Sequence, residues 1–216
     1  MLDVGCGDGS FLLEAQRQGW EVSGTEVNPR LARERGLTIH EELVRASPAG
    51  PYGCITLWHS LEHFRDPQAA VQEAASLLAP DGVMLIAVPN WSGAQARAFG
   101  AQWFHLDVPR HLFHFSAQSL SVLAGQCNLQ VRQTWHTEAE LDLFGWTQSA
   151  LNRVLDQPNL LFSLVMGKPT RLSLAQKGVQ LALGSVATLA ALPLFSTSVA
   201  LGRGGIIVHA LRRRPL

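Results

Sequence analysis

The chain has 216 residues, enough for one domain with a substantial buried core. Apolar residues make up 47% of the chain and charged residues 16%, a composition that excludes a disordered polyelectrolyte. The 17 basic and 17 acidic residues give a formal net charge of +0, so we expect no nucleic-acid partner. The three cysteines form no CxxC pair, and the chain starts directly in a strand-like run. These features predict a cytoplasmic protein without a disulfide framework or a thiolate zinc site.

Strand and helix signals alternate along the chain. An apolar run over 1–4 ends in the glycine-rich segment GCGDG, and a predicted helix over 10–18 follows. Six further runs read as strands: 21–25, 37–40, 54–58, 83–88, 129–135 and 205–210. Helix signals separate most of these strands, the clearest being the Asp66-Pro67 start. Repeated β-α-β units predict an α/β fold with a doubly wound, mostly parallel, seven-stranded Rossmann-like sheet.

Two segments depart from this regular alternation. The first strand has four residues before its glycines, so it is shortened at the N-terminus. Either the natural chain begins further upstream, or the ligand pocket lacks part of one wall. Residues 137–204 are far longer than an ordinary loop, and 178–202 carry no charge. We therefore interpret residues 1–216 as a single domain with an apolar helical insertion at 137–204 before the last strand.

A nucleotide site is predicted beside the first strand. Ligands of open α/β sheets bind beyond the carboxyl ends of the strands, which is where GCGDG lies. Glu26 ends the second strand, at the spacing of about 20 residues where an acid can accept hydrogen bonds from ribose hydroxyls. The glycine spacing is G-x-G-x-G, and Asp3 precedes it. An acid there would repel a pyrophosphate but suits a sulfonium cofactor, so a nicotinamide dinucleotide is the second choice and a ligand-free glycine turn the third.

The order of motifs resembles one family. LDVGCGDG, TEVNP, LWHSLEHFRDP and LLAPDGVMLIAVPN look like the successive motifs of class I S-adenosylmethionine-dependent methyltransferases. The likeness is closest to the branch with the ubiquinone-biosynthesis O-methyltransferases, to which WFHLDVPRHLFHFS and the final GRGGIIVHALRR are also similar. It covers residues 1 to about 135 and that final segment. The resemblance implies a single transferase domain with S-adenosyl-L-methionine as its cofactor, used for small-molecule methylation.

The resemblance also implies a set of cofactor-binding residues on the first four strands and the loops after them: Asp3, Gly5, Gly7, Gly9, Glu26, Glu42, Leu43, Trp58 and His59. The glycines and Asp3 would surround the methionine end, and Glu26 would hold the ribose. Glu42 and Leu43 would contact the adenine. Trp58 and His59 would lie near the reacting methyl group.

No dyad marks a catalytic base, which in-line methyl transfer needs only when the acceptor is a hydroxyl or a protonated amine. His111 is the first candidate and His59 the second. Trp103, Arg110 and His114 are candidate substrate contacts, because acceptors normally enter after the fifth strand in this family. The alternative is that this segment is a structural lid whose histidines bond to the backbone.

His59 to His63 also matches H-x-x-E-H, a zinc-peptidase pattern. No later Glu stands out as a third ligand, so a peptidase is not favoured. On one helical face, His59, Glu62 and His63 could instead hold a divalent ion that supports methyl transfer. We expect no metal, with His63 hydrogen-bonded internally and His59 on the pocket wall.

The segment 178–202 is long and uncharged enough to be a candidate membrane span, but the next strand must return to the same sheet. We favour a pair of apolar helices, the first with Trp146 and Leu160, Leu161 and Phe162, that caps the acceptor pocket or lies in a membrane interface. Packing on the sheet or in a homodimer is the alternative.

The predicted function is in-line transfer of a methyl group to a small, hydrophobic and lipid-like acceptor, such as a quinone or a polyketide-like ring. A catalytically inactive S-adenosylmethionine-binding protein is the alternative, and a nicotinamide-dependent oxidoreductase is less favoured. The protein is expected in the cytoplasm, with membrane association through 178–202 as an additional hypothesis.

Overall fold

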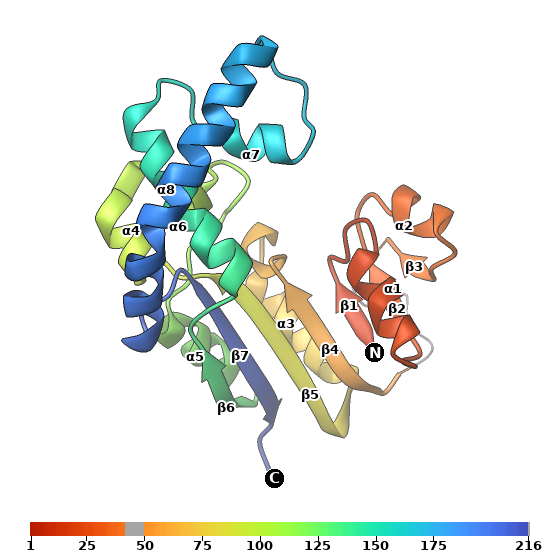
Figure 1. Ribbon diagram of the computed structural model, residues 1–216. Helices are drawn as coiled ribbons and strands as arrows, with labels where there is room; N and C mark the ends of the chain where they lie inside the picture. Colours follow the sequence, from red (N-terminus) through yellow and green to blue (C-terminus); the bar gives the residue numbers. More distant parts are fainter. Residues whose placement is uncertain (42–49, 216) are drawn as a thin grey trace. The chain divides into compact units, whose positions relative to one another are not determined.

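The computed structural model describes residues 1–41 and 50–215, which form two compact units (Figure 1). The first unit comprises the described parts of Met1–Val88, Ala117–Trp135 and Val208–Leu216. The second comprises Pro89–Ser116 and His136–Ile207. That residues 1–216 form a single domain stays a prediction.

The first unit is built on a seven-stranded sheet, in the order β3-β2-β1-β4-β5-β7-β6. Its strands are β1 (Leu2–Val4), β2 (Ser23–Thr25), β3 (Ile39–His40), β4 (Tyr52–Trp58), β5 (Leu78–Pro89), β6 (Leu129–Trp135) and β7 (Ile206–Arg213). The pairs from β3 to β5 are parallel, and β6 pairs antiparallel with β7. The predicted mostly parallel Rossmann-like sheet is confirmed, including its short first strand.

The helices of this unit follow the expected alternation with the strands: α1 (Ser10–Arg17), α2 (Arg30–Glu34), the 3-10 helix η1 (Leu61–His63), α3 (Pro67–Ser76) and α5 (Ala117–Gln126). The start of α3 illustrates how local sequence determines where a helix begins. The Asp66 carboxylate accepts a hydrogen bond from the Ala69 amide at 2.9 Å, and Pro67 occupies the first turn. Between α1 and the sheet, Leu12 is fully buried in a cluster with Cys6, Ala32, Leu37 and Ile39.

One strand differs from its prediction. β5 begins at Leu78 rather than Val83, because Tyr52 of β4 pairs with Leu78 while Cys54 pairs with Val83. Residues 80–82, which directly precede the predicted strand 83–88, thus form an irregularity within β5.

The second unit is helical: α4 (Ala94–Phe99), η2 (Gly100–Gln102), η3 (Phe104–Leu106), α6 (Ala139–Val154), α7 (Leu160–Val165) and α8 (Leu174–Ala200). Figure 1 shows α6 and α8 side by side, and Thr147 of α6 meets Thr188 of α8 with 3.0 Å between their hydroxyl oxygens. The expectation of two helices after residue 136 is wrong, because Trp146 belongs to α6 whereas Leu160, Leu161 and Phe162 belong to the separate α7.

Helix α8 begins with a capping box between Ser173 and Gln176 and continues through Pro193. Within residues 1–41 and 50–215, it is the one helix that is long and apolar enough to cross a membrane by length and composition. Buried residues make up 11% of its most apolar 18-residue stretch.

At the base of these helices, Asp142 of α6 is fully buried. Its carboxylate accepts hydrogen bonds from the Gly205 amide at 2.8 Å and from Gln95 Nε2 at 2.5 Å. Burial raises the pKa of Asp142 to about 6, against the opposing effect of these hydrogen bonds. The carboxyl group therefore joins α6, α4 and the segment that leads into β7.

Candidate functional site

The carboxyl ends of three neighbouring strands converge at one edge of the first unit's sheet. β1 lies between β2 and β4, and the strand order reverses there. In register, Val4 lies beside Thr25 and Asp3 beside Thr56, so the segments that follow β1, β2 and β4 leave the sheet near one another. A reversal of this kind is where open α/β sheets bind ligands.

The loop after β1 bends through three glycines with positive φ, at +77° for Gly5, +56° for Gly7 and +78° for Gly9. The three positions require glycine for different reasons. A Cβ on Gly5 would lie 2.6 Å from Ser60 Cβ, and one on Gly9 would collide with Leu37. At Gly7, among the described residues, no atom lies within 4 Å of that position. Gly5 and Gly9 are thus required by the protein's own packing, while Gly7 leaves room for a ligand to approach the backbone.

Glu26 follows β2 and is held by the backbone on both sides. Its Oε2 accepts a hydrogen bond from the Gly7 amide at 2.9 Å, and its Oε1 accepts one from the Asn28 amide at 3.2 Å. A carboxylate offers about four lone-pair sites, so two acceptor positions remain. The residue predicted to hold a ribose therefore lies against the glycine loop in a fixed orientation.

Asp3 lies within β1 and is 4% exposed. Its Oδ1 accepts a hydrogen bond from Thr56 Oγ1 at 2.6 Å. Burial raises the pKa of Asp3 to about 6, the Thr56 hydrogen bond opposes this, and the charge of Glu26 adds to it. Two acids next to one glycine loop make a region that favours a bound cation.

Cys6, within the same loop, has no corresponding role. Burial in the first place, with the charges of Asp3 and Glu26, raises the pKa of its thiol to about 12. The thiol is therefore protonated and unreactive at neutral pH, as expected for a small apolar residue.

Trp58 ends β4 and stacks with Phe11 of α1, with ring centroids 6.4 Å apart and an angle of 20° between the planes. Phe11 is 48% exposed. Phe11 lies in the helix predicted over 10–18, and helix periodicity alone does not predict that its side chain would contact a ligand. The sequence feature that could have indicated such a contact is the position of Phe11 directly after GCGDGS, because the start of α1 adjoins the glycine loop.

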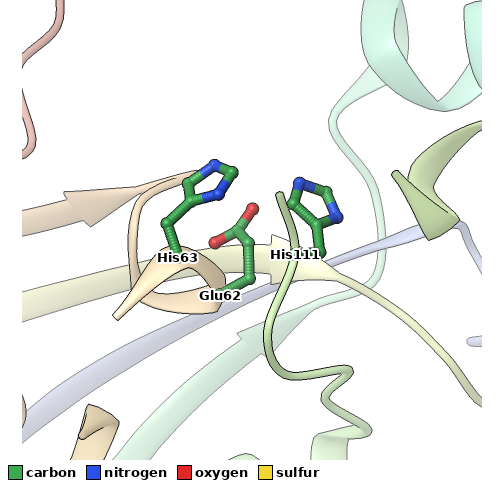
Figure 2. Close-up of side chains that lie close together, drawn as sticks. All are labelled: Glu62, His63 and His111. Atoms are coloured by element: carbon green, nitrogen blue, oxygen red, sulfur yellow. The ribbon is translucent and has the colours of Figure 1, made fainter. Parts of the chain in front are cut away.

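His59 follows Trp58 with φ at +50°, a left-handed conformation that is uncommon outside glycine. Its Nδ1 lies 3.8 Å from Oε1 of the buried Glu62. Glu62 and His63 both belong to the three-residue η1, and Figure 2 shows them beside each other. The assumption that His59, Glu62 and His63 share one helical face is wrong, because His59 precedes the helix. Their role as metal ligands stays a prediction.

Figure 2 also labels His111, which belongs to the second unit. Within that unit, His111 Nδ1 lies 2.8 Å from the His105 carbonyl oxygen, and its Nε2 lies 3.9 Å from Asp107 Oδ2. A carbonyl oxygen can only accept a hydrogen bond, so Nδ1 carries the proton and Nε2 the lone pair in the neutral ring. Asp107 would stabilise the ring after proton uptake.

The three predicted substrate contacts have different environments in the second unit. Trp103 is 2% exposed, and its indole nitrogen donates to Gln95 Oε1 at 3.4 Å. His114 Nε2 lies 3.0 Å from the Leu106 carbonyl oxygen. Arg110 is exposed and pairs with Asp107 at 2.9 Å. Of the three, Arg110 presents its side chain most openly to solvent.

The predicted adenine contacts Glu42 and Leu43 lie outside the described residues. The preceding residue, Glu41, is exposed and accepts a hydrogen bond from Arg33 at 2.8 Å.

Comparisons with known proteins agree with this arrangement. A ubiquinone biosynthesis O-methyltransferase from Pectobacterium atrosepticum is 32% identical over 124 residues, covering 51% of this chain and 52% of that protein. The protein of the same name from Xanthomonas axonopodis pv. citri is 28% identical over 129 residues, covering 53% and 54%. The chain therefore spans about half the length of the curated relatives it matches.

Solved structures share the fold. A SAM-dependent methyltransferase from Archaeoglobus fulgidus has a TM-score of 0.58 at 16% identity, covering 99% of this chain and 85% of its own. Magnesium protoporphyrin IX methyltransferase from Synechocystis, solved with bound SAH, has a TM-score of 0.52 at 17% identity, covering 64% and 67%. At these identities the likeness concerns the fold alone.

A family model described as a methyltransferase domain matches residues 1–134, more than half of the chain. The match includes the glycine loop, Glu26 and the end of β4, and it does not favour the nicotinamide alternative. The predicted family and its cofactor, S-adenosyl-L-methionine, are confirmed. The chain belongs to the S-adenosylmethionine-dependent methyltransferases.

Proposed function

We propose that this chain transfers a methyl group from S-adenosylmethionine to a hydroxyl oxygen of a small, apolar acceptor. The observation that carries the proposal is the position of Glu26. Its carboxylate is fixed by the Gly7 and Asn28 amides at the point where the strand order reverses. A carboxylate so placed can accept hydrogen bonds from two ribose hydroxyls without rearranging.

The residues of the first unit fit this cofactor in charge and in space. The open position at Gly7 allows a ligand close to the backbone, and the buried Asp3 with Glu26 favours a cation there. Trp58 and Phe11 offer an apolar, partly exposed surface beside the loop. The bound cofactor supplies a methyl group already activated on a sulfonium, so the protein's task is to align the acceptor with it.

The choice of a hydroxyl acceptor rests on the O-methyltransferase relatives and on His111. The Nδ1 of this imidazole is held by the His105 carbonyl oxygen, which leaves Nε2 as the basic nitrogen. Uptake of the hydroxyl proton at Nε2 would produce an imidazolium near the Asp107 carboxylate, 3.9 Å away. Such a base typically contributes about 10²–10⁴-fold to the rate. His59 is the second candidate for the same role.

The apolar nature of the acceptor rests on composition and relatives. The second unit exposes large apolar side chains, among them Val108, Leu112 and Phe113 of the segment that carries His111. The relatives are named for ubiquinone biosynthesis, which is in keeping with a ring-bearing, lipid-like acceptor.

Calorimetric titration with S-adenosylmethionine and with its demethylated product tests the cofactor site. We expect Glu26→Ala to weaken cofactor binding at least about tenfold, since two ribose hydrogen bonds of about 1 kcal/mol each are lost. Glu14→Ala is the matched control, because Glu14 is an exposed acid of α1 that contacts Gln18 and Arg17. Equal affinities of both variants and wild type would remove Glu26 from the site.

A methyl-transfer assay with phenolic and quinol acceptors then separates the enzyme from an inactive cofactor-binding protein. Binding of the cofactor with turnover of a phenolic acceptor supports the proposal. Tight cofactor binding without methylation of any hydroxyl acceptor favours the inactive protein. Absence of cofactor binding by the folded wild-type chain contradicts both.

A further inference from the structure

Helix α8 buries its small side chains. Its most buried residues are Gly184, Ala191 and Ser198, spaced by seven so that they lie on one face. At Gly184 the neighbouring helix α7 comes so close that an added Cβ would lie 2.8 Å from Leu161 Cδ2. On the same face, the Thr188 hydroxyl meets that of Thr147 on α6. The buried positions of α8 are thus occupied by small residues, while the larger Phe195 and Val199 are half-buried.

Most of the large aliphatic side chains of α8 point the other way. The residues that are more than half exposed include Val179, Leu181, Val186, Leu189 and Leu194. A helix on the surface of a water-soluble protein normally shows the opposite arrangement, with large apolar residues inward and polar residues outward. Small residues between helices and large aliphatic residues outside are the pattern of helices that pack in lipid.

Two exposed hydroxyl groups of α8 are hydrogen-bonded within the helix. The exposed Ser185 hydroxyl donates to the Leu181 carbonyl at 3.0 Å, and the exposed Thr197 hydroxyl donates to that of Pro193 at 2.7 Å. Hydroxyl groups bonded in this way add little cost when the surface leaves water.

The charged residues of α8 and of the chain segments directly before and after it are all positive. Asp156 is the last acidic residue of the chain, and the 60 residues after it contain only basic charges. Lys168, Arg171 and Lys177 lie at the beginning of the helix or just before it, and Arg203 lies just after its end. A long apolar face with cations at both ends matches an apolar interior below negatively charged headgroups.

The chain connections exclude a simple crossing. β6 and β7 pair antiparallel, with Trp135 beside Val208, so the segment between them leaves and rejoins the sheet at the same end. A crossing by α8 would need a second crossing by residues 136–173. The α6 helix within them has 16 residues and carries the buried Asp142 and Gln148, so it is too short and too polar to span about 30 Å. The helix α8, about 40 Å long, can instead lie along a surface.

We propose that the exposed face of α8 binds a membrane surface that contains anionic lipid, with the helix lying in the plane of the interface. The inference concerns location and does not depend on the proposed chemistry. A second copy of this chain is the competing occupant. The charge pattern disfavours it, because a symmetric contact along this face would bring cations of the two copies near one another.

Flotation of the full chain with lipid vesicles tests this proposal. The vesicles are phosphatidylcholine alone or mixed with phosphatidylglycerol, and the cofactor is absent, so that failure here is distinct from failure of methyl transfer. The variant V186Q/L189Q removes two side chains that are 66% and 68% exposed. The control V122Q/L31Q makes the same two types of substitution elsewhere. Val122 of α5 is 56% exposed and Leu31 of α2 is 59% exposed.

We expect wild type and control to float with the phosphatidylglycerol vesicles, and V186Q/L189Q to bind at least about tenfold more weakly. Neutralising Lys168, Arg171 and Lys177 with glutamine should abolish the preference for the anionic vesicles. The proposal is overturned if wild type binds neither vesicle, or if V186Q/L189Q binds as tightly as the control. It is also overturned in favour of a second copy if wild type is a dimer by light scattering, V186Q/L189Q is a monomer, and neither floats.

Discussion

Helices α3 and α8 both bury mostly small side chains, but they expose opposite kinds of side chain to solvent. In α3, Val71 and the alanines beside it are buried and Gln72 is exposed. In α8, Gly184 and Ala191 are buried while Leu189 and its aliphatic neighbours are exposed. The apolar content of a sequence thus predicts that a helix forms, but the direction of its large side chains depends on what surrounds it.

The difference has an energetic consequence in water. The first unit is stabilised by side chains such as Leu12 that leave water completely on folding. The exposed leucines of α8 remain in water and contribute little to the unfolding free energy until lipid covers them. The helix is held instead by close packing of small residues and by the Thr147–Thr188 contact.

The largest expected effect on stability comes from a substitution that tests this difference between the first unit and α8. Leu12→Ala removes a fully buried side chain and should lower the free energy of unfolding by about 3 kcal/mol, through lost burial and a cavity. Leu189→Ala, at 68% exposure, should change it by less than about 0.5 kcal/mol without lipid. Urea-induced unfolding followed by circular dichroism measures both. A loss at Leu189 as large as that at Leu12 would show that another surface covers α8 in solution.

A second comparison concerns the buried carboxyl groups, Asp3 in the first unit and Asp142 in the second. Burial raises the pKa of each to about 6, from 3.8. An acid with a raised folded pKa binds its proton more tightly in the folded state, so it lowers stability as pH rises from about 4 to about 6. Each group should therefore cost up to about 3 kcal/mol of unfolding free energy at pH 7 relative to pH 4.

The measurement is urea unfolding at pH 4 and pH 7 for wild type, Asp3→Asn and Asp142→Asn. The difference between wild type and each variant isolates one carboxyl group from all others. Asp3→Asn should gain stability relative to wild type at pH 7 and lose affinity for S-adenosylmethionine, since its charge destabilises the fold but attracts the cation. Asp142→Asn should leave cofactor affinity unchanged. A pH-independent difference would place the folded pKa of that carboxyl group near its ordinary value.

The first unit could be predicted closely because its determinants are local. The Asp66 cap acts within three residues of its position, and the glycines and the acid after the second strand follow a spacing that can be read directly along the chain. The sequence could not reveal that Ser60 and Leu37, distant in the chain, are the reason for Gly5 and Gly9. Nor could it reveal the left-handed His59, which breaks the helical face assumed for the H-x-x-E-H pattern.

Prediction was weaker for residues 137–204. Their composition indicates apolar helices, but the choice between two helices and three depends on the chain reversal around Asn159, which has φ at +58°. The inward placement of Gly184 and outward placement of Leu189 depends on α7 lying against α8, a contact between segments that no periodicity specifies.

The smallest expected change in stability comes from glycine-to-alanine substitutions on the exposed and on the packed side of α8. Gly178 lies in the exposed first turns, and among the described residues no atom lies within 4 Å of a Cβ built there. Gly178→Ala should therefore raise the unfolding free energy by about 0.5–1 kcal/mol, because alanine restricts the unfolded chain and favours the helix.

Gly184→Ala makes the same chemical change on the packed side. The new methyl group would lie 2.8 Å from Leu161 Cδ2 and 3.1 Å from Cδ1, so a side chain that is 6% exposed must move. We expect this strain to cancel the gain in helix propensity, leaving a stability at or below that of wild type in thermal and urea unfolding. A gain at Gly184 equal to that at Gly178 would mean that α7 and α8 are not in close contact in solution. The small-residue packing from which we infer a lipid-facing side would then lose its basis.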